Sequence, residues 1–143
     1  MKTLLALVLG LFLAAPAASQ VRIEITGGAE SALPIAVVPF RENRVSPGLD
    51  MAQVIRDNLY RSGLFDPIRP SDYLGSPSRF EDVRFRNWRA LGADTLVVGN
   101  ISPLDNGNYR VRYELLAVYA GNRITGQCFS VSPEGLRNLA HTI

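Results

Sequence analysis

The spacing of apolar residues divides the chain into strand and helix patterns. Residues 20–26 alternate apolar and polar side chains, which predicts an edge strand that has one face covered. Residues 34–40 and 95–101 are continuous apolar runs rich in β-branched side chains, and they predict two strands buried on both faces, the first of them central. Residues 64–68 form a short extended stretch between these runs. Together these segments predict strands of one β-sheet.

Two helices are predicted between these strands. Ser46 and Pro47 form a helix-start signal, with serine as the N-cap and proline at the first helical position. Apolar residues follow at helical spacing until Gly63, which ends the helix. A second helix is predicted from about residue 82 to residue 91 and ends at Gly92.

The C-terminal part predicts a three-stranded meander and a third helix. The Asn-Gly pair within residues 105–108 favours a hairpin turn, and the strands 109–119 and 124–131 follow it. Ser132 and Pro133 repeat the helix-start signal. The apolar stripe of this helix is Leu136, Leu139, Ala140 and Ile143. No C-cap follows the stripe, so the helix is expected to be truncated here. The fold class is therefore α/β, with helices packed on one mixed five-stranded sheet.

The N-terminus predicts a secretory signal peptide. Lys2 precedes the apolar run of residues 3–14, which is shorter than the roughly 20 residues of a membrane-spanning helix. Small residues allow cleavage before Ala18 or before Gln20, and we expect the latter. The chain then divides into a signal peptide (1–19) and one mature domain (20–143), which is exported and not membrane-spanning after cleavage. An uncleaved anchor or a buried helix is the alternative.

Charge and cysteine content exclude several classes of function. Fifteen Lys and Arg against 13 Asp and Glu give a formal charge of +2, too balanced to indicate nucleic acid or anionic lipid as a partner. The single cysteine, Cys128, excludes an internal disulfide and any multi-cysteine metal site. We expect it to be a small filler residue and not a nucleophile, and we expect no metal or cofactor.

Catalytic patterns are weak in this chain. No serine lies in a nucleophile-elbow motif, and no glycine pattern of a nucleotide-binding loop joins a strand to a helix. His141 is the only histidine and has no cysteine near it in the sequence. Glu81 and Asp82 are expected to cap the second helix. The sequence therefore predicts no enzyme and no small-molecule substrate, the alternative being a small hydrolase that pairs Asp or Glu with His141.

One segment interleaves arginine and aromatic side chains. Its members are Arg79, Phe80, Arg84, Phe85, Arg86, Trp88 and Arg89. Such a segment could stack nucleic-acid bases, but Glu81 and Asp82 lie among the arginines, and an exported protein seldom meets nucleic acid. We expect instead an amphipathic helix with Phe85, Trp88 and Leu91 turned inward and the guanidinium groups in solvent.

Several motifs in register resemble a known family. They are Val21-Arg22-Ile23-x-Ile25, Gly28, Pro34-Ile35-Ala36-Val37-Val38-Pro39-Phe40, Arg61-Ser62-Gly63-Leu64-Phe65, Trp88-x-x-Leu91-Gly92-Ala93-Asp94 and Val97-Val98-Gly99. Together these motifs cover essentially the whole predicted mature chain. The mature chain therefore resembles the N-terminal domain of the periplasmic TolB family of the Tol-Pal system. The resemblance implies a fold similar to anticodon-binding domains, a periplasmic location and no enzymatic activity.

The resemblance also implies a binding role for the start of the mature chain. In the family this segment binds the C-terminal domain of TolA, and the system maintains the outer membrane and its invagination at cell division. The corresponding residues here are Gln20, Val21, Arg22, Ile23, Glu24 and Ile25. Gln20 and Glu24 depart from the acidic and the aliphatic residue expected there. Pal and colicins bind the family's β-propeller, so they are partners only where a propeller is present.

Two alternatives remain open for this segment and for the domain. A strand at a chain end can complete its own sheet or be donated to the sheet or groove of another protein. The domain could also be a periplasmic accessory module for cell-wall synthesis or export.

Overall fold

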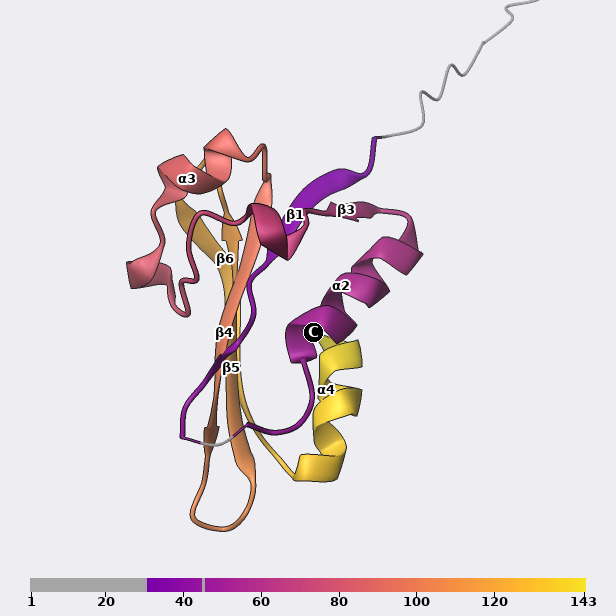
Figure 1. The fold of residues 1–143 in the computed structure, drawn as a ribbon, viewed down its shortest axis with the longest axis vertical. Coiled ribbons are helices and arrows are strands. Elements are labelled where there is room, and N and C mark those ends of the chain that lie inside the picture. Colours follow the sequence, from indigo (N-terminus) through magenta and orange to yellow (C-terminus); the bar gives the residue numbers. More distant parts are fainter. Residues whose placement is uncertain (1–30, 45) are drawn as a thin grey trace, which may run out of the picture.

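The computed structural model describes residues 31–44 and 46–143 (Figure 1), so the predicted signal peptide and the predicted strand at 20–26 lie outside the described residues. The strands are β1 (Leu33–Val37), β2 (Arg41–Glu42), β3 (Phe65–Pro67), β4 (Thr95–Pro103), β5 (Tyr109–Ala117) and β6 (Asn122–Val131). The helices are α2 (Met51–Ser62), α3 (Phe85–Ala90) and α4 (Leu136–Thr142), with 3-10 turns η2 (Pro70–Asp72), η3 (Phe80–Asp82) and η4 (Pro133–Gly135).

The strands form one mixed sheet in the order β3-β1-β4-β5-β6, and β2 also pairs with β4. β1 runs parallel to β3 and β4, whereas β4, β5 and β6 are antiparallel neighbours. The predicted α/β class, with helices on a mixed sheet, is confirmed. Besides the four predicted strands that the structure describes, the sheet contains the two short strands β2 and β3.

β1 and β4 are buried on both faces, as their apolar runs predicted. Ile35 and Val37 of the β1 segment pack on one side of the sheet, and Ala36 and Val38 pack on the other. β1 ends at Val37, earlier than predicted. Pro39 has no N–H to continue the ladder, and the chain returns to β4 only as β2.

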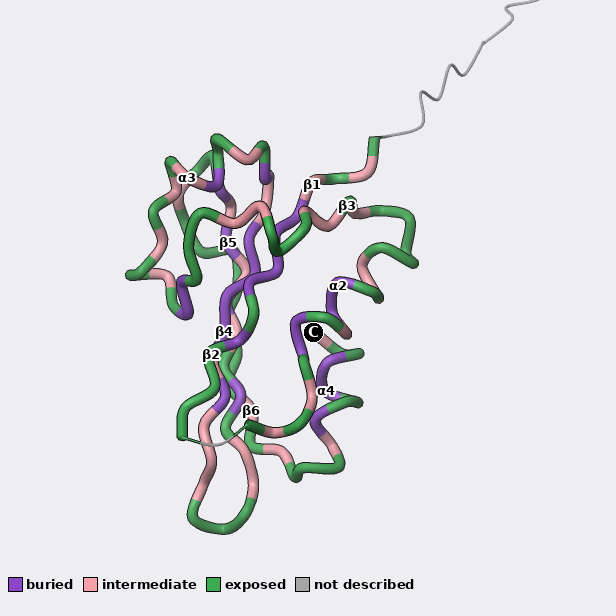
Figure 2. The backbone as a smooth tube through the Cα atoms, in the orientation of Figure 1, coloured by how far each residue is buried: buried purple, intermediate pink, exposed green. Residues whose placement is uncertain are grey.

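The sheet separates two hydrophobic cores. α2 and α4 lie side by side over one face, and α3 with its preceding loop lies over the other (Figure 1). The first core contains Ile35, Val37, Phe40, Met51, Ala52, Ile55, Val97, Ile101, Val111, Leu136, Leu139 and Ala140. The second contains Ala36, Val38, Trp88, Ala93, Leu96, Val98, Leu116 and Val118. In Figure 2, purple marks the buried residues, which follow the middle of the sheet and the inner sides of the helices.

The start of α2 differs from the prediction. The helix begins at Met51 instead of Pro47, and its N-cap is Asp50, whose carboxylate accepts a hydrogen bond from the Gln53 N–H at 3.0 Å. Gly48 has a φ of +69°, which directs the chain through a turn before the helix starts. The predicted end is confirmed, because Gly63 adopts the left-handed conformation with a φ of +72°.

The second predicted helix is also shorter than expected. Residues 80–82 form the separate turn η3, and α3 begins only at Phe85, after Arg84 as N-cap. Glu81 and Asp82 therefore do not cap this helix. The Phe80 N–H donates a 2.7 Å hydrogen bond to Glu114 on β5, which ties η3 to the sheet. Val83 and Arg84 then have non-helical backbone angles, with ψ of 121° and 85°, and they separate η3 from α3.

The C-terminal meander and helix follow the prediction closely. Gly107 has a φ of +83° in the turn between β4 and β5, and β5 pairs with β6 with an irregularity at Leu115 and Leu116. The Ser132 hydroxyl accepts a hydrogen bond from the Gly135 N–H at 3.3 Å and caps η4, which leads into α4. The predicted stripe Leu136, Leu139 and Ala140 is buried against α2.

Candidate protein-binding surface

A groove of about 750 Å³ lies where the described part of the chain begins. The start of β1, the C-terminal end of α2 and the start of β3 form its walls. Its lining residues are Ser31, Ala32, Pro34, Tyr60, Arg61, Gly63, Phe65 and Asp66. We call this groove the entry groove, because the segment from residue 20 joins the described chain there.

Large apolar side chains are exposed around the entry groove. Leu33 is 50% exposed, Leu64 is 66% exposed and Tyr60 is 70% exposed. The Leu33 N–H donates a 2.9 Å hydrogen bond to the Leu64 carbonyl, so two of these residues are held beside each other. A group of exposed apolar side chains at one place is typical of a surface that contacts a partner.

Two polar side chains bind the backbone of Val37 at the end of β1: the buried Arg56 of α2 and the half-buried Tyr73, which follows η2. The Arg56 guanidinium donates a 2.9 Å hydrogen bond to the Val37 carbonyl. The Tyr73 hydroxyl accepts a 3.0 Å hydrogen bond from the Val37 N–H and donates to the Ile68 carbonyl at 2.9 Å. Burial raises the pKa of Tyr73, so its hydroxyl stays protonated as a donor. The only sequence signal for Arg56 was its place one turn after Ala52 on the apolar side of α2.

β3 is a poor template for a further strand. It contains only Phe65, Asp66 and Pro67, and it pairs with β1 on one side. Pro67 has no N–H to donate to a neighbour. An extended segment that enters at Ser31 therefore finds little backbone to pair with at this edge of the sheet.

The residues predicted to bind TolA, Gln20 to Ile25, lie outside the described residues. The chain that follows them enters the described part at Ser31, which itself lines the entry groove. The structure thus leaves their role as a prediction, and it adds the exposed Leu33, Tyr60 and Leu64, which no sequence pattern marked.

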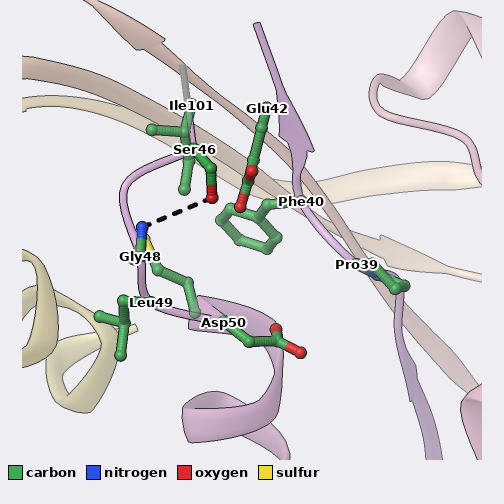
Figure 3. A pocket seen from close by; sticks show the side chains of 9 residues that line it. Pro39, Phe40, Glu42, Ser46, Gly48, Leu49, Asp50 and Ile101 are labelled. Atoms are coloured by element: carbon green, nitrogen blue, oxygen red, sulfur yellow. Dashed lines mark hydrogen bonds between the residues drawn. The ribbon is translucent and has the colours of Figure 1, made fainter.

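A second hollow, of about 490 Å³, lies between β2 and the start of α2 (Figure 3). The Phe40 ring lies at its centre, with Glu42 beside it. The Ser46 hydroxyl accepts a 3.5 Å hydrogen bond from the Gly48 N–H, and Asp50 caps α2. These two polar groups therefore stabilise the turn and the helix start.

The remaining catalytic candidates lie apart from one another. His141 contacts Asn58 of α2, with 2.9 Å between His141 Nδ1 and Asn58 Nδ2, instead of a carboxylate. Cys128 is exposed on β6, so the expectation that it is a small filler residue is wrong. Within residues 31–44 and 46–143, no group of three or more His, Cys, Asp or Glu side chains could hold a metal ion.

The aromatic side chains of the arginine-rich segment pack inward. Trp88 is buried, with its ring 5.1 Å from that of Tyr73, and Phe80 and Phe85 pack against the second core. Arg89 donates to the Val118 carbonyl at 3.2 Å. The predicted inward side of the helix is confirmed, whereas the Arg89 guanidinium binds backbone carbonyls instead of lying free in solvent. The second core takes up most of the ring surface that base stacking would need.

Fold and surface together define a small α/β domain with an exposed apolar groove beside its N-terminal entry. Residues 21–124 match the family described as the TolB amino-terminal domain. The chain therefore belongs to the TolB amino-terminal domain family. In the part of the chain that the structure describes, no helix is long and apolar enough to cross a membrane.

Similar proteins support the same assignment. The chain is 42% identical over 121 residues to the Tol-Pal system protein TolB of Nitrosococcus oceani, and 43% identical over 123 residues to that of Alkalilimnicola ehrlichii. Each match covers 85% of this chain but only 28% of the relative, so the chain spans less than a third of the length of these relatives. The relatives bear the name of a Tol-Pal system protein and not that of an enzyme.

Solved structures share the fold. TolB from Acinetobacter baumannii superposes with a TM-score of 0.63 at 24% identity, over 78% of this chain and 26% of that chain. The LpoB C-terminal domain from Salmonella enterica gives a TM-score of 0.57 at 16% identity, over 74% of this chain and 87% of that chain. At such identities the likeness concerns the fold alone.

Proposed function

We propose that this chain is a periplasmic protein-binding module of the Tol-Pal system and that it recruits the C-terminal domain of TolA. The residues we assign to this contact are Gln20, Val21, Arg22, Ile23, Glu24 and Ile25. The observation that supports the proposal most strongly is the family match, which begins at residue 21 and so includes five of these six residues.

The proposed mechanism is the addition of an extended strand to TolA. Val21, Ile23 and Ile25 alternate with polar residues, so they lie on one face of an extended segment and can fill apolar pockets of a partner. Arg22 supplies a charge-assisted contact. The short β3 edge with Pro67 favours donation of this strand over pairing at that edge of the chain's own sheet.

The exposed surface of the entry groove supports a partner next to this strand. Tyr60 and Leu64 lie beside the point where the segment joins the domain, and both are exposed apolar residues. We propose that a protein bound to residues 20–25 also contacts them. Tyrosine is among the residues that contribute most when buried at protein interfaces.

Calorimetric titration of the TolA C-terminal domain into the chain tests the proposal. Deletion of residues 20–26 should abolish the heat of binding and leave the unfolding transition unchanged. Ile23→Ser should weaken binding about ten-fold or more, since a buried isoleucine contributes roughly 1.5–3 kcal/mol. Thr26→Ser, just outside the six residues, serves as the matched control. Equal affinity of the parent chain and the deletion variant would refute this mechanism.

The periplasmic location rests on the predicted signal peptide. Mass spectrometry of the chain recovered from a periplasmic fraction should give an N-terminus at Gln20. An N-terminus at Ala18 would keep the location and move the cleavage site, whereas an intact Met1 in the membrane fraction would contradict it.

Roles in outer-membrane integrity and cell division belong to the proposed membership of the Tol-Pal system. Pal and colicins are not proposed as partners of residues 20–143, because in the family they bind the propeller, and this chain matches only 28% of each relative's length.

A further inference from the structure

One part of the sheet carries arginine side chains and is not covered by a helix. On β5, Val111 and Tyr113 pack in the core under α2 and α4, so Arg110 and Arg112 lie on the opposite face. α3 lies over that face only at its other end, around Trp88 (Figure 1). Arg110 and Arg112 are both exposed.

This open face forms a hollow of about 520 Å³, which we call the arginine hollow. Four arginines from three places in the fold line it: Arg41 of β2, Arg79 before η3, and Arg110 and Arg112 of β5. Asn100 of β4 lies between Arg41 and Arg112 in the strand register, and Ser102 lies opposite Arg110. Since neighbouring strands are about 4.8 Å apart, the backbones that carry Arg41 and Arg112 are about 10 Å apart.

No carboxylate of the described residues lines this hollow. The ion pairs found in the described part of the chain involve Arg56, Arg69 and Arg123 instead. Glu114, the next residue on the same face of β5, is already held by the Phe80 N–H and by Arg123. Like charges gathered on adjacent strands repel one another, so the cluster lowers stability unless an anion joins it.

The composition of the lining indicates the chemistry of that anion. Arginine binds phosphate and carboxylate oxygens through paired N–H donors, and Asn100 and Ser102 add hydrogen-bonding groups for hydroxyls. No large aliphatic or aromatic side chain lines the hollow, so an apolar peptide or an acyl chain would find no contact there. The spacing of the arginines suits a ligand with more than one negative group.

We propose that the arginine hollow binds a hydrophilic ligand that carries two linked phosphate groups. Arg110 and Arg112 hold one phosphate from β5, and Arg41 and Arg79 hold the other from the opposite side of the hollow. The diphosphate can be free in solution or can be the headgroup of a lipid. The arginine hollow shares no lining residue with the entry groove, and the proposal for it uses none of residues 20–25, so its test is independent of TolA binding.

Titration with inorganic pyrophosphate tests the site, with orthophosphate as the comparison ligand. We expect saturable binding of pyrophosphate that is tighter than that of orthophosphate and weakens as salt is raised, since the contacts are exposed and screened. Arg112→Gln should weaken pyrophosphate binding about ten-fold, the loss of one charge-assisted contact. Arg137→Gln on α4 is the matched control, because it removes the same charge from an exposed position outside the hollow.

Vesicles of phosphatidylcholine with a prenyl diphosphate lipid distinguish the two sources of the ligand. Binding to both pyrophosphate and vesicles supports a lipid headgroup, and binding to pyrophosphate alone supports a free ligand. Thermal unfolding of Arg112→Gln confirms that the variant is folded. The proposal is overturned if the parent chain shows no saturable binding of pyrophosphate, or if Arg137→Gln weakens binding as much as Arg112→Gln does.

Discussion

Glu114 is the buried carboxylate that joins the sheet to η3, and its replacement measures what this contact contributes to stability. Its side chain is 6% exposed, whereas that of its ion-pair partner Arg123 is 53% exposed. One carboxylate oxygen accepts the Phe80 N–H at 2.7 Å, and the other accepts an Arg123 N–H at 2.6 Å. Glu114→Ala removes both contacts and leaves a partly buried N–H without its acceptor.

The expected magnitude follows from these two contacts. A hydrogen bond from a partly buried N–H to a charged acceptor contributes about 1.5–3 kcal/mol. An ion pair with a half-exposed arginine contributes at most about 1 kcal/mol, because solvent screens it. We therefore expect Glu114→Ala to lower the free energy of unfolding by about 3 kcal/mol, a large share of the roughly 5–15 kcal/mol of a typical domain.

Urea unfolding followed by circular dichroism measures this loss, and Glu114→Gln is the matched control. Glutamine keeps one oxygen that can accept the Phe80 N–H but loses the ion pair, so its loss should be about 1 kcal/mol. Both variants should keep the slope of the parent chain, so that the shift in midpoint reports stability. If Glu114→Ala unfolds at the same urea concentration as the parent, Glu114 does not hold η3 and the reasoning is refuted.

Three further changes test other parts of the fold. Trp88→Ala should lower the free energy of unfolding by about 3–5 kcal/mol, because it empties the centre of the second core; a loss below 1 kcal/mol in urea unfolding would contradict this placement. Gly99→Ala should destabilise the chain by about 1–3 kcal/mol in the same assay, because the new Cβ would lie 2.6 Å from the Phe40 ring and 2.7 Å from the Arg112 carbonyl oxygen; unchanged stability would contradict this close packing of β4. Burial raises the pKa of Tyr73, so its contribution to stability is complete below about pH 10 and is lost as pH rises through the folded-state pKa. Tyr73→Phe should therefore be less stable than the parent at neutral pH, and the difference should shrink in alkaline solution; a constant difference would refute a titrating Tyr73.

Backbone features with strong local causes could be predicted from the sequence. Gly63 ends α2 because glycine adopts the left-handed conformation without strain. The Asn-Gly pair at Asn106 and Gly107 forms the turn after β4 for the same reason. Continuous apolar runs predicted β1 and β4, because strands that are covered on both faces do not alternate apolar and polar residues.

Features that depend on distant contacts could not be predicted. The signal at Ser46 and Pro47 is a sound local helix start, but the turn at Gly48 delays the helix to Asp50. The predicted helix from residue 82 is interrupted because Val83 and Arg84 leave the helical conformation, and Val83 packs against the second core. The entry groove was missed for a similar reason, since exposed apolar residues such as Tyr60 and Leu64 resemble ordinary helix-end residues until β1, α2 and β3 are brought together.

The sequence of β5 contained one informative irregularity, which the fold explains. Arg110, Arg112 and Glu114 occupy one face of the strand, and Leu116 and Val118 then continue the same alternate positions with apolar side chains. This change lies where α3 and the loop before it begin to cover the face of the sheet. Glu114 lies at the border of the covered part and accepts a hydrogen bond from η3. Arg110 and Arg112 lie on the uncovered part of this face, where packing of apolar side chains does not explain their presence. The same change from charged to apolar residues thus locates both the stabilising contact of Glu114 and the hollow proposed to bind a diphosphate.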